Sequence, residues 1–179
     1  EAAAARHGGS VAPTLEAAMD PDRVDAVLLS VPHDLHEPLV RQAAAAGLHV
    51  VVEKPLGADL ASARSAVEAA EQAGVVLSVC FPFRYEPTIV AARRFVEDGA
   101  IGAFRGAALV FHADKPDAYW LGGYSGRAAS DWRLHRDRAG GGVLIMSITH
   151  HLDFVRHLTG AEASLVTAVA RPDDPKQVE

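Results

Sequence analysis

Three short apolar runs separated by two helix-like segments constrain the fold of this chain more than any other feature. The runs cover residues 26–31, 48–52 and 75–81. Between them, apolar residues recur at helical spacing over 35–46 and 60–73, each segment is followed by a glycine (Gly47 or Gly74), and Asp59 is a suitable cap for the second. Runs that are apolar at nearly every position are typical of parallel strands buried on both faces. We therefore predict an α/β fold with a parallel sheet covered by helices on both faces.

The alternation of strands and helices ends at Phe81, where we place a domain boundary. Beyond it, the chain has two amphipathic segments and two further apolar runs. These segments predict helices over 87–98 and 140–158 and strands over 104–111 and 164–170. The stretch 113–138 is rich in glycine and aromatic residues. A connection of that length is usually functional or disordered, and the aromatic residues favour an ordered loop that lines a site. We predict two domains, residues 1–81 and residues 82–179.

Composition excludes several classes of function. The chain has 179 residues and a net charge of −6, so it lacks the basic surface that binding to nucleic acid or to anionic membranes requires. It has no apolar run near the roughly 20 residues that a membrane-spanning helix needs. Its one cysteine, Cys80, has no partner for a disulfide within the chain, which fits a reducing compartment. We therefore expect a cytoplasmic protein that binds neither nucleic acid nor membrane.

Two polar clusters follow the first two predicted strands, at the edge of a parallel sheet where ligands bind. Residues 30–36 form the first cluster, and Glu53, Lys54 and Pro55 form the second. A lysine at the end of a buried strand can have a lowered pKa, which suits proton transfer. An ordinary solvated lysine is the alternative that position alone leaves open.

Two histidine patterns suggest metal binding or proton transfer. His33 and His36 have the spacing of a metal-binding pair, but no third ligand lies at a suitable spacing, so a cofactor edge and helix packing are favoured over a metal site. His150 and Asp153 lie three residues apart on one helix face, where the carboxylate is placed to fix an imidazole tautomer. A surface pair without a function is the alternative for these two residues.

Three consecutive glycines, Gly140 to Gly142, precede the last predicted helix. They match neither the Gly-x-Gly-x-x-Gly fingerprint nor a P-loop, although a helix N-terminus can bind phosphate. Close packing of the backbone against another segment is the favoured explanation.

Short motifs along the chain occur in an order and spacing that match one known family. They are Asp25-Ala26-Val27 leading to Pro32 and His36, Ala46-Gly47-Leu48-His49-Val50, Glu53-Lys54-Pro55, Phe81 to Tyr85 with Pro87, Trp132-Arg133, Gly140-Gly141-Gly142-Val143-Leu144, and His150-x-x-Asp153. A single motif such as Glu-Lys-Pro is weak, whereas the whole series in register is specific. With these motifs, the chain resembles the Gfo/Idh/MocA family of nicotinamide-dependent sugar and inositol oxidoreductases.

The resemblance implies a fold and an activity. The fold is a partial Rossmann domain with a doubly wound parallel sheet over residues 1–81, followed over 82–179 by part of an α+β domain with an open sheet. The activity is a hydride transfer, dependent on NAD or NADP, between nicotinamide and a secondary alcohol or carbonyl of a sugar, a polyol or a related compound. The implied partners are a small-molecule substrate and, in the intact protein, further copies of the same chain.

The resemblance also implies roles for individual residues. Lys54, His150 and Asp153 are the catalytic candidates. The cofactor-binding candidates are Ser30, Pro32, His33, His36, Glu53, Lys54, Pro55, Trp132 and Arg133. The substrate-binding candidates are Arg84, Tyr85, Tyr124 and His150. No residue is a candidate metal ligand.

The chain also departs from the family pattern. Met146 stands where many members have an aspartate, which removes the third polar residue of an inositol-type triad, and Ile148 stands where glycine is usual. The dinucleotide-binding glycine fingerprint is missing, and residues 1–8 resemble the end of a helix, so the resemblance implies a fragment cut at both ends. Two other functions stay open, a non-catalytic relative that senses a nucleotide or sugar and an NAD-dependent glycosidase of the same family.

Overall fold

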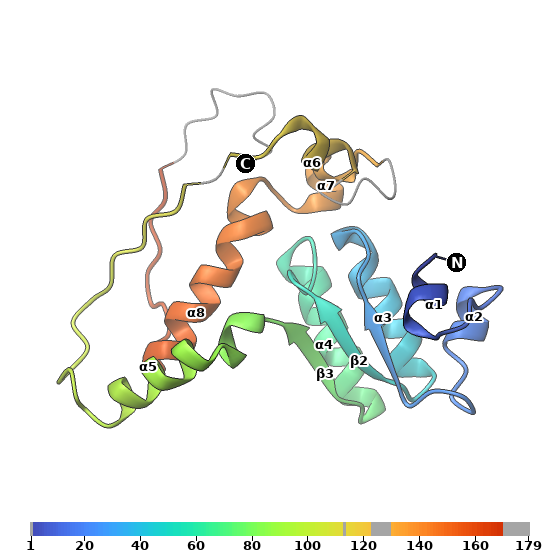
Figure 1. Cartoon of the computed structure of the whole chain (residues 1–179), viewed down its shortest axis with the longest axis horizontal. Helices are drawn as coiled ribbons and strands as arrows, with labels where there is room; N and C mark the ends of the chain where they lie inside the picture. Colours follow the sequence, from blue (N-terminus) through green and yellow to red (C-terminus); the bar gives the residue numbers. More distant parts are fainter. Residues whose placement is uncertain (1, 113, 123–129, 170–179) are drawn as a thin grey trace.

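The computed structural model describes residues 2–112, 114–122 and 130–169. Its centre is a three-stranded parallel sheet in the order β1-β2-β3. The strands are β1 (Ala26–Leu29), β2 (His49–Glu53) and β3 (Leu77–Cys80), and the connecting helices are α3 (His36–Ala45) and α4 (Leu60–Ala73), as Figure 1 shows. This arrangement confirms the predicted α/β fold.

The strand order explains why both helices pack on the same face of the sheet. Connections between parallel strands of one sheet are right-handed as a rule, and both connections here step in the same direction, so α3 and α4 lie side by side. The core that they bury consists of Met19, Leu29, Val40, Ala43, Leu48, Val50, Val52 and Ala66.

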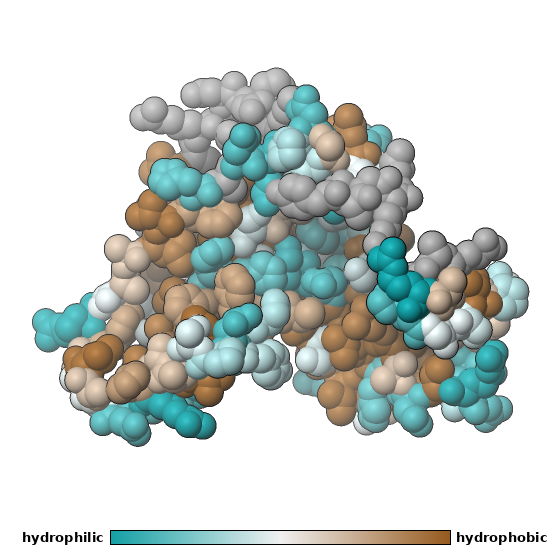
Figure 2. Space-filling view, in the orientation of Figure 1, coloured by the Kyte–Doolittle hydropathy of each residue, from teal (hydrophilic) through white to brown (hydrophobic). Residues whose placement is uncertain are grey.

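Within the described residues, helices α3 and α4 cover one face of the sheet and the opposite face is open. Alternate side chains of β1 and β2 point away from the core, and Leu28 is 70% and Val51 37% exposed. Figure 2 shows hydrophobic side chains gathered where the strands lie. An apolar run predicts side chains that can be buried on both faces, but it does not show which element covers each face.

Local signals in the sequence set the ends of α4 as predicted. The Asp59 carboxylate accepts a hydrogen bond from the Ser62 backbone N–H at 2.7 Å, and the Asp59 N–H donates to the Ser62 hydroxyl at 3.2 Å. This reciprocal capping box satisfies two backbone donors that the first helical turn leaves free. The helix ends at Gly74, whose φ of +68° is a left-handed conformation that glycine adopts without strain.

The rest of the described chain is built from short helical elements and one longer pair of packed helices. The helices are α1 (Ala2–His7), α2 (Leu15–Ala18), α5 (Pro87–Glu97), α6 (Asp117–Gly122), α7 (Arg136–Ala139) and α8 (Thr149–Thr159). Shorter turns are η1 (His33–Leu35), η2 (Pro82–Tyr85), η3 (Trp132–Leu134) and the π-helical η4 (Leu144–Ile148). Helix α5 packs along α8 (Figure 1). No helix in the described ranges has both the length and the apolar character needed to cross a membrane.

The two strands predicted beyond Phe81 are wrong for the described residues. Residues 104–111 and 164–169 run as extended coil without a pairing partner, and nearly all of their side chains are exposed, whereas Ala170 lies outside the described ranges. A strand is stable only with a neighbour that receives its backbone hydrogen bonds. The apolar pattern indicates a strand but says nothing about that neighbour.

Both helices predicted in the same part of the chain are present. The helix predicted over 87–98 is α5, and the one predicted over 140–158 is found as η4 followed by α8. The long stretch 113–138 is not a plain loop, because it contains α6, η3 and most of α7.

Segments far apart in the sequence meet beside the carboxyl ends of the strands. His33 Nδ1 lies 2.7 Å from the carbonyl oxygen of Ala139, and Arg138 Nε donates to Asp34 Oδ2 at 3.1 Å. Because the His33 ring is only 5% exposed, burial lowers its pKa to about 4. The ring is therefore neutral near pH 7 and donates its single N–H, on Nδ1, to Ala139.

Gly140, which follows Ala139, packs its backbone closely against Ala58 in the segment between β2 and α4. Its φ is +83°, and a Cβ atom placed there would collide with the carbonyl group of Ala58 and meet Ile145 Cδ1 at 2.9 Å. The packing interpretation of the glycine run is therefore confirmed at this position.

A Gly140→Ala variant is expected to lose more stability than a positive φ alone explains. The strained backbone conformation costs about 1–2 kcal/mol for alanine, and displacing the Ala58 carbonyl adds to that cost, for a total of roughly 3 kcal/mol. Gly160→Ala is the matched control, since Gly160 has a φ of +66° with nothing within 4 Å of the added Cβ. Denaturant unfolding measures both, and an equal loss in the two variants would contradict the packing role.

Stability is also expected to fall as the pH is lowered from about 6.5 to about 4. In this window the unfolded chain binds a proton at His33 that the buried ring does not accept, so unfolding gains up to about 3 kcal/mol from that site. His33→Asn should flatten this part of the stability profile relative to the parent. Proton NMR of the ring provides the direct measurement, and a titration midpoint near 6.5 would exclude the effect.

Candidate active site

A cavity of about 200 Å³ lies at the carboxyl ends of β1 and β2. It is lined by Ser30, Val31, His33, Glu53, Lys54, Tyr119, Trp132, Arg133 and Met146. Six of these were predicted from the sequence as cofactor-binding residues: Ser30, His33, Glu53, Lys54, Trp132 and Arg133. Open parallel sheets bind ligands at this edge, so the position of the cavity makes it the candidate active site.

Lys54 is the central cation of the cavity. It directly follows β2, and its Nζ donates to the backbone carbonyl oxygen of Met146 at 2.6 Å. Burial is the main cause of a lowered Lys54 pKa, the charges of Lys115 and Arg133 lower it further, and Glu53 opposes them. The amine therefore releases its proton more readily than a solvated lysine, which is the property that proton transfer requires.

Arg133 is held between two aromatic rings at the wall of the cavity. Its guanidinium carbon lies 4.5 Å from the centre of the Trp132 ring and 4.8 Å from that of Tyr119. Stacking leaves the in-plane N–H groups available, and Nε is buried without a hydrogen-bond partner. Because a buried donor without an acceptor is costly, Arg133 is well suited to donate to a ligand. Tyr119 was not among the named site residues, although the aromatic content of 113–138 predicted a segment that lines a site.

His150 lies beside the cavity rather than in its lining. Its ring contacts Phe81 and Phe83, with ring centres 6.1 and 5.4 Å away. Burial, and then the positive charge of Lys54, lowers the pKa of His150, so the imidazole is neutral at neutral pH. Its Nδ1 is buried without a hydrogen-bond partner. The side chain is therefore available for proton exchange.

Asp153 does not orient His150, which corrects that part of the prediction. Its carboxylate is 6% exposed and accepts hydrogen bonds from Nε and Nη2 of Arg84, at 2.8 and 2.5 Å. A bidentate pair of opposite charges is stronger than a bond to a neutral imidazole. Two donors of Arg84, a predicted substrate residue, are thereby committed to this ion pair.

His36 cannot contact a cofactor, contrary to the prediction. Its side chain is fully buried, its Nδ1 lies 2.7 Å from the carbonyl oxygen of Pro55, and its Nε2 lies 3.0 Å from that of Val31. Both polar edges of the ring therefore face backbone oxygens, and neither faces the cavity.

The other predicted residues are less closely tied to the cavity. Pro32 immediately precedes η1 and is half-buried, and Pro55 presents its carbonyl to His36. Tyr85 is 78% exposed on η2, outside the cavity lining, and Tyr124 lies outside the described residues. Within the described ranges, no three His, Cys, Asp or Glu side chains come together in a way that could hold a metal ion.

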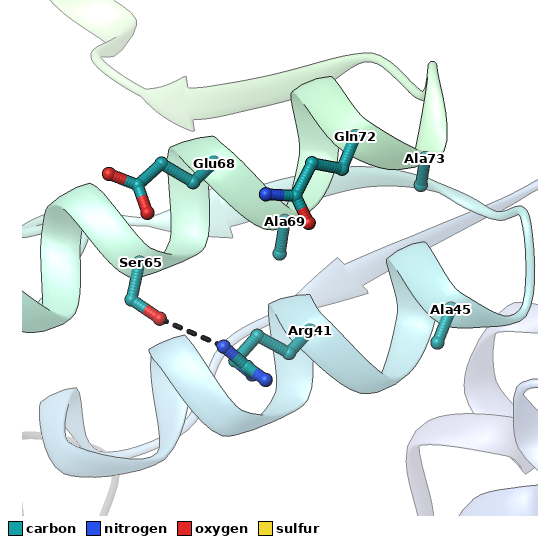
Figure 3. Close-up of a pocket in the computed structure, with 7 residues that line it drawn as sticks. All are labelled: Arg41, Ala45, Ser65, Glu68, Ala69, Gln72 and Ala73. Carbon is teal, nitrogen blue, oxygen red and sulfur yellow. Dashed lines mark hydrogen bonds between the residues drawn. The ribbon is translucent and has the colours of Figure 1, made fainter.

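A larger groove of about 320 Å³ lies between α3 and α4 (Figure 3). It is lined by Arg41, Ala45, Ser65, Glu68, Ala69, Gln72 and Ala73, and Arg41 Nη1 donates to Ser65 Oγ at 3.1 Å. None of the predicted site residues lines this groove. The smaller cavity at the sheet edge therefore remains the candidate site.

Two family models match the chain. Residues 1–81 match the oxidoreductase family with an NAD-binding Rossmann fold, and residues 89–179 match the GFO/IDH/MocA C-terminal domain.

Individual relatives agree with this match. Levoglucosan dehydrogenase of Pseudarthrobacter phenanthrenivorans is 32% identical over 88% of this chain and 39% of that protein. The 1,5-anhydro-D-fructose reductase of Ensifer adhaerens is 37% identical over 91% of this chain and 46% of that protein. The crystal structure of aldose-aldose oxidoreductase from Caulobacter crescentus complexed with glycerol aligns with a TM-score of 0.72 and 29% identity, over 90% of this chain and 46% of that one. The chain spans less than half the length of these relatives. It belongs to the GFO/IDH/MocA oxidoreductase family.

Proposed function

We propose that the protein is an NAD(P)-dependent oxidoreductase that moves a hydride between nicotinamide and a secondary alcohol or carbonyl group of a sugar, a polyol or a related compound. The observation that carries this proposal is Lys54, a partly buried amine with a lowered pKa at the carboxyl end of β2. A Rossmann-type sheet places such a residue where a bound dinucleotide meets its substrate. The names of the relatives, a dehydrogenase and a reductase of sugar derivatives, support the same class of reaction.

The cavity suits the nicotinamide end of NAD or NADP. Arg133 offers a buried N–H that lacks a partner, and the rings of Trp132 and Tyr119 hold its guanidinium in place. Ser30 and Glu53 add polar groups along the sheet edge. When bound, the cofactor accepts or supplies the hydride, whereas the chain's own residues handle the proton and the charge.

Proton transfer is assigned to Lys54 together with His150. Oxidation of an alcohol releases the hydroxyl proton, so a base must lie within hydrogen-bond distance of that oxygen. Lys54 reaches into the cavity, and its ammonium form stabilises negative charge on the reacting oxygen. His150 has a lowered pKa beside Lys54, so its neutral ring can take part in the same proton exchange. Asp153 supports the site by holding Arg84 against α8.

The proposal also includes a domain boundary near Phe81, a homo-oligomeric state and a cytoplasmic location. A boundary near Phe81 is supported by the two family matches, which end at residue 81 and resume at residue 89. Assembly into a homo-oligomer is supported by exposed apolar side chains on the α5–α8 pair, such as Phe95 and Leu152. A cytoplasmic setting suits the free thiol of Cys80.

The proposed reaction is tested by following nicotinamide absorbance while the protein is incubated with NAD+ or NADP+ and a panel of sugars and polyols. Net reduction of the cofactor by at least one member of the panel is expected. Glycoside cleavage without net cofactor change would instead identify the glycosidase, and cofactor binding without turnover on any substrate would identify a sensor.

Lys54→Ala is expected to lower kcat by about 10²- to 10⁴-fold, because it removes both the proton acceptor and the charge beside the reacting oxygen. Lys54→Arg keeps the charge but holds its proton throughout the accessible pH range, so it should recover only part of the loss. Arg41→Ala, in the groove between α3 and α4, is the control and should keep full turnover. A fully active Lys54→Ala variant would refute the mechanism.

The role of His150 is tested by the pH dependence of alcohol oxidation. The reaction needs its neutral ring, so the rate should fall as the pH drops through a value below 6.5, the direction in which burial and Lys54 shift the pKa of His150. His150→Gln should remove this acidic limb from the kcat profile. If the limb persists unchanged in the variant, another group is responsible for it.

A further inference from the structure

The ring of His36 joins the two loops that leave β1 and β2. His36 begins α3, its side chain is fully buried, and its two nitrogens face the carbonyl oxygens of Val31 and Pro55. Val31 lines the candidate site, and Pro55 is bonded directly to Lys54, which also lines it. The ring therefore touches the backbone on both sides of the cavity without entering it.

The two carbonyl contacts determine which nitrogens of the His36 ring must carry a hydrogen atom. Carbonyl oxygens only accept hydrogen bonds, so each contact requires an N–H on the imidazole. A neutral ring has one N–H and an imidazolium has two, and the shorter contact is the one from Nδ1 to Pro55, at 2.7 Å against 3.0 Å to Val31. The contact from Nδ1 to Pro55 ties the loop after β2 to α3.

This loop controls where the Lys54 amine lies. Lys54 Nζ reaches the carbonyl of Met146 at 2.6 Å, and its side chain starts from the backbone that His36 restrains. A shift of that backbone by about 1 Å changes the distance from Nζ to a bound hydroxyl, and such misplacement can cost a reaction about 10²-fold.

From these contacts we infer that His36 is a positioning residue for Lys54, acting through its Nδ1–H bond to the Pro55 carbonyl. The inference rests on the proposed role of Lys54 in the reaction. Simple core packing is the competing explanation, and it predicts that a hydrophobic side chain of similar size serves as well.

Two substitutions separate these explanations, because asparagine places an amide N–H where the histidine has Nδ1 and leucine places none. His36→Leu is expected to lower kcat by about 10- to 100-fold, with the KM for substrate changed less than about threefold. His36→Asn is expected to stay within about fivefold of the parent. Equal kcat values in the two folded variants would overturn the inference.

A third variant and a control distinguish a loss of positioning from a loss of folding. His36→Gln places its amide where the histidine has Nε2, toward Val31, so it should lose kcat as the leucine variant does while keeping a polar group in the site. His49→Leu is the matched control, since His49 also hydrogen-bonds to the backbone, at Val76 N–H, but lies at the opposite end of β2. Its kcat should not change.

A spectroscopic readout tests the positioning without relying on turnover. The chain has three lysines, Lys54, Lys115 and Lys176, so reductive ¹³C-methylation gives a simple NMR spectrum in which Lys54→Arg identifies the Lys54 signal. His36→Leu should move the titration of that signal toward 10.5, because a loosened Lys54 gains solvent. His36→Asn should leave it in place.

The two proposals fail in different ways. A fully active Lys54→Ala variant, with the His36→Leu shift still present in the NMR titration, would refute the proposed function and leave the positioning role intact. An unchanged Lys54 titration in a folded His36→Leu variant would refute the positioning role whatever the activity.

Discussion

A partly buried ammonium group needs an oxygen close to it, and Lys54 finds one in the carbonyl of Met146, 92 positions further along the chain. This requirement links the end of β2 to η4, so the site exists only when the two parts of the chain are packed together. The neighbouring contacts enforce that packing: His33 bonds to Ala139, and the backbone of Gly140 lies against Ala58. Stability of the junction and geometry of the site therefore depend on the same few residues.

The sheet region could be predicted from the sequence because its signals are local. The apolar runs, the Asp59 cap and the glycine after each helix act within a few residues, and the structure places the elements close to where these signals put them. The strands predicted over 104–111 and 164–170 depend on a partner strand, which a local pattern cannot supply. The exposure of Leu28 on the open face of the sheet likewise depends on which element lies opposite it, and a local pattern does not specify that element.

Six of the predicted site residues line the cavity, but the sequence did not reveal which side chains pair with one another. Helical spacing places His150 and Asp153 on one face, yet Asp153 bonds to Arg84, which is 69 positions away and carries a full charge. The spacing cannot reveal such a competitor. The role of His36 could not be predicted for a similar reason. A histidine that binds a ligand and one that contacts two backbone carbonyls occupy the same place in a sequence motif. Tyr119 lines the cavity and stacks with Arg133, a contact between two segments that have no shared sequence pattern.

The departure from the family at Met146 has a narrower effect than its position suggests. Met146 holds Lys54 through a backbone carbonyl, which every residue type possesses, so a thioether in place of a carboxylate leaves that bond intact. The side chain itself packs with Trp132, Ala139 and Ile145, and this makes the wall of the cavity beside Lys54 apolar. Polar recognition of a substrate must then come from Ser30, which follows β1, from Glu53, which ends β2, and from Arg133, which has a donor without a partner. The substitution therefore makes this part of the cavity apolar and leaves Lys54, the proposed proton-transfer group, in place.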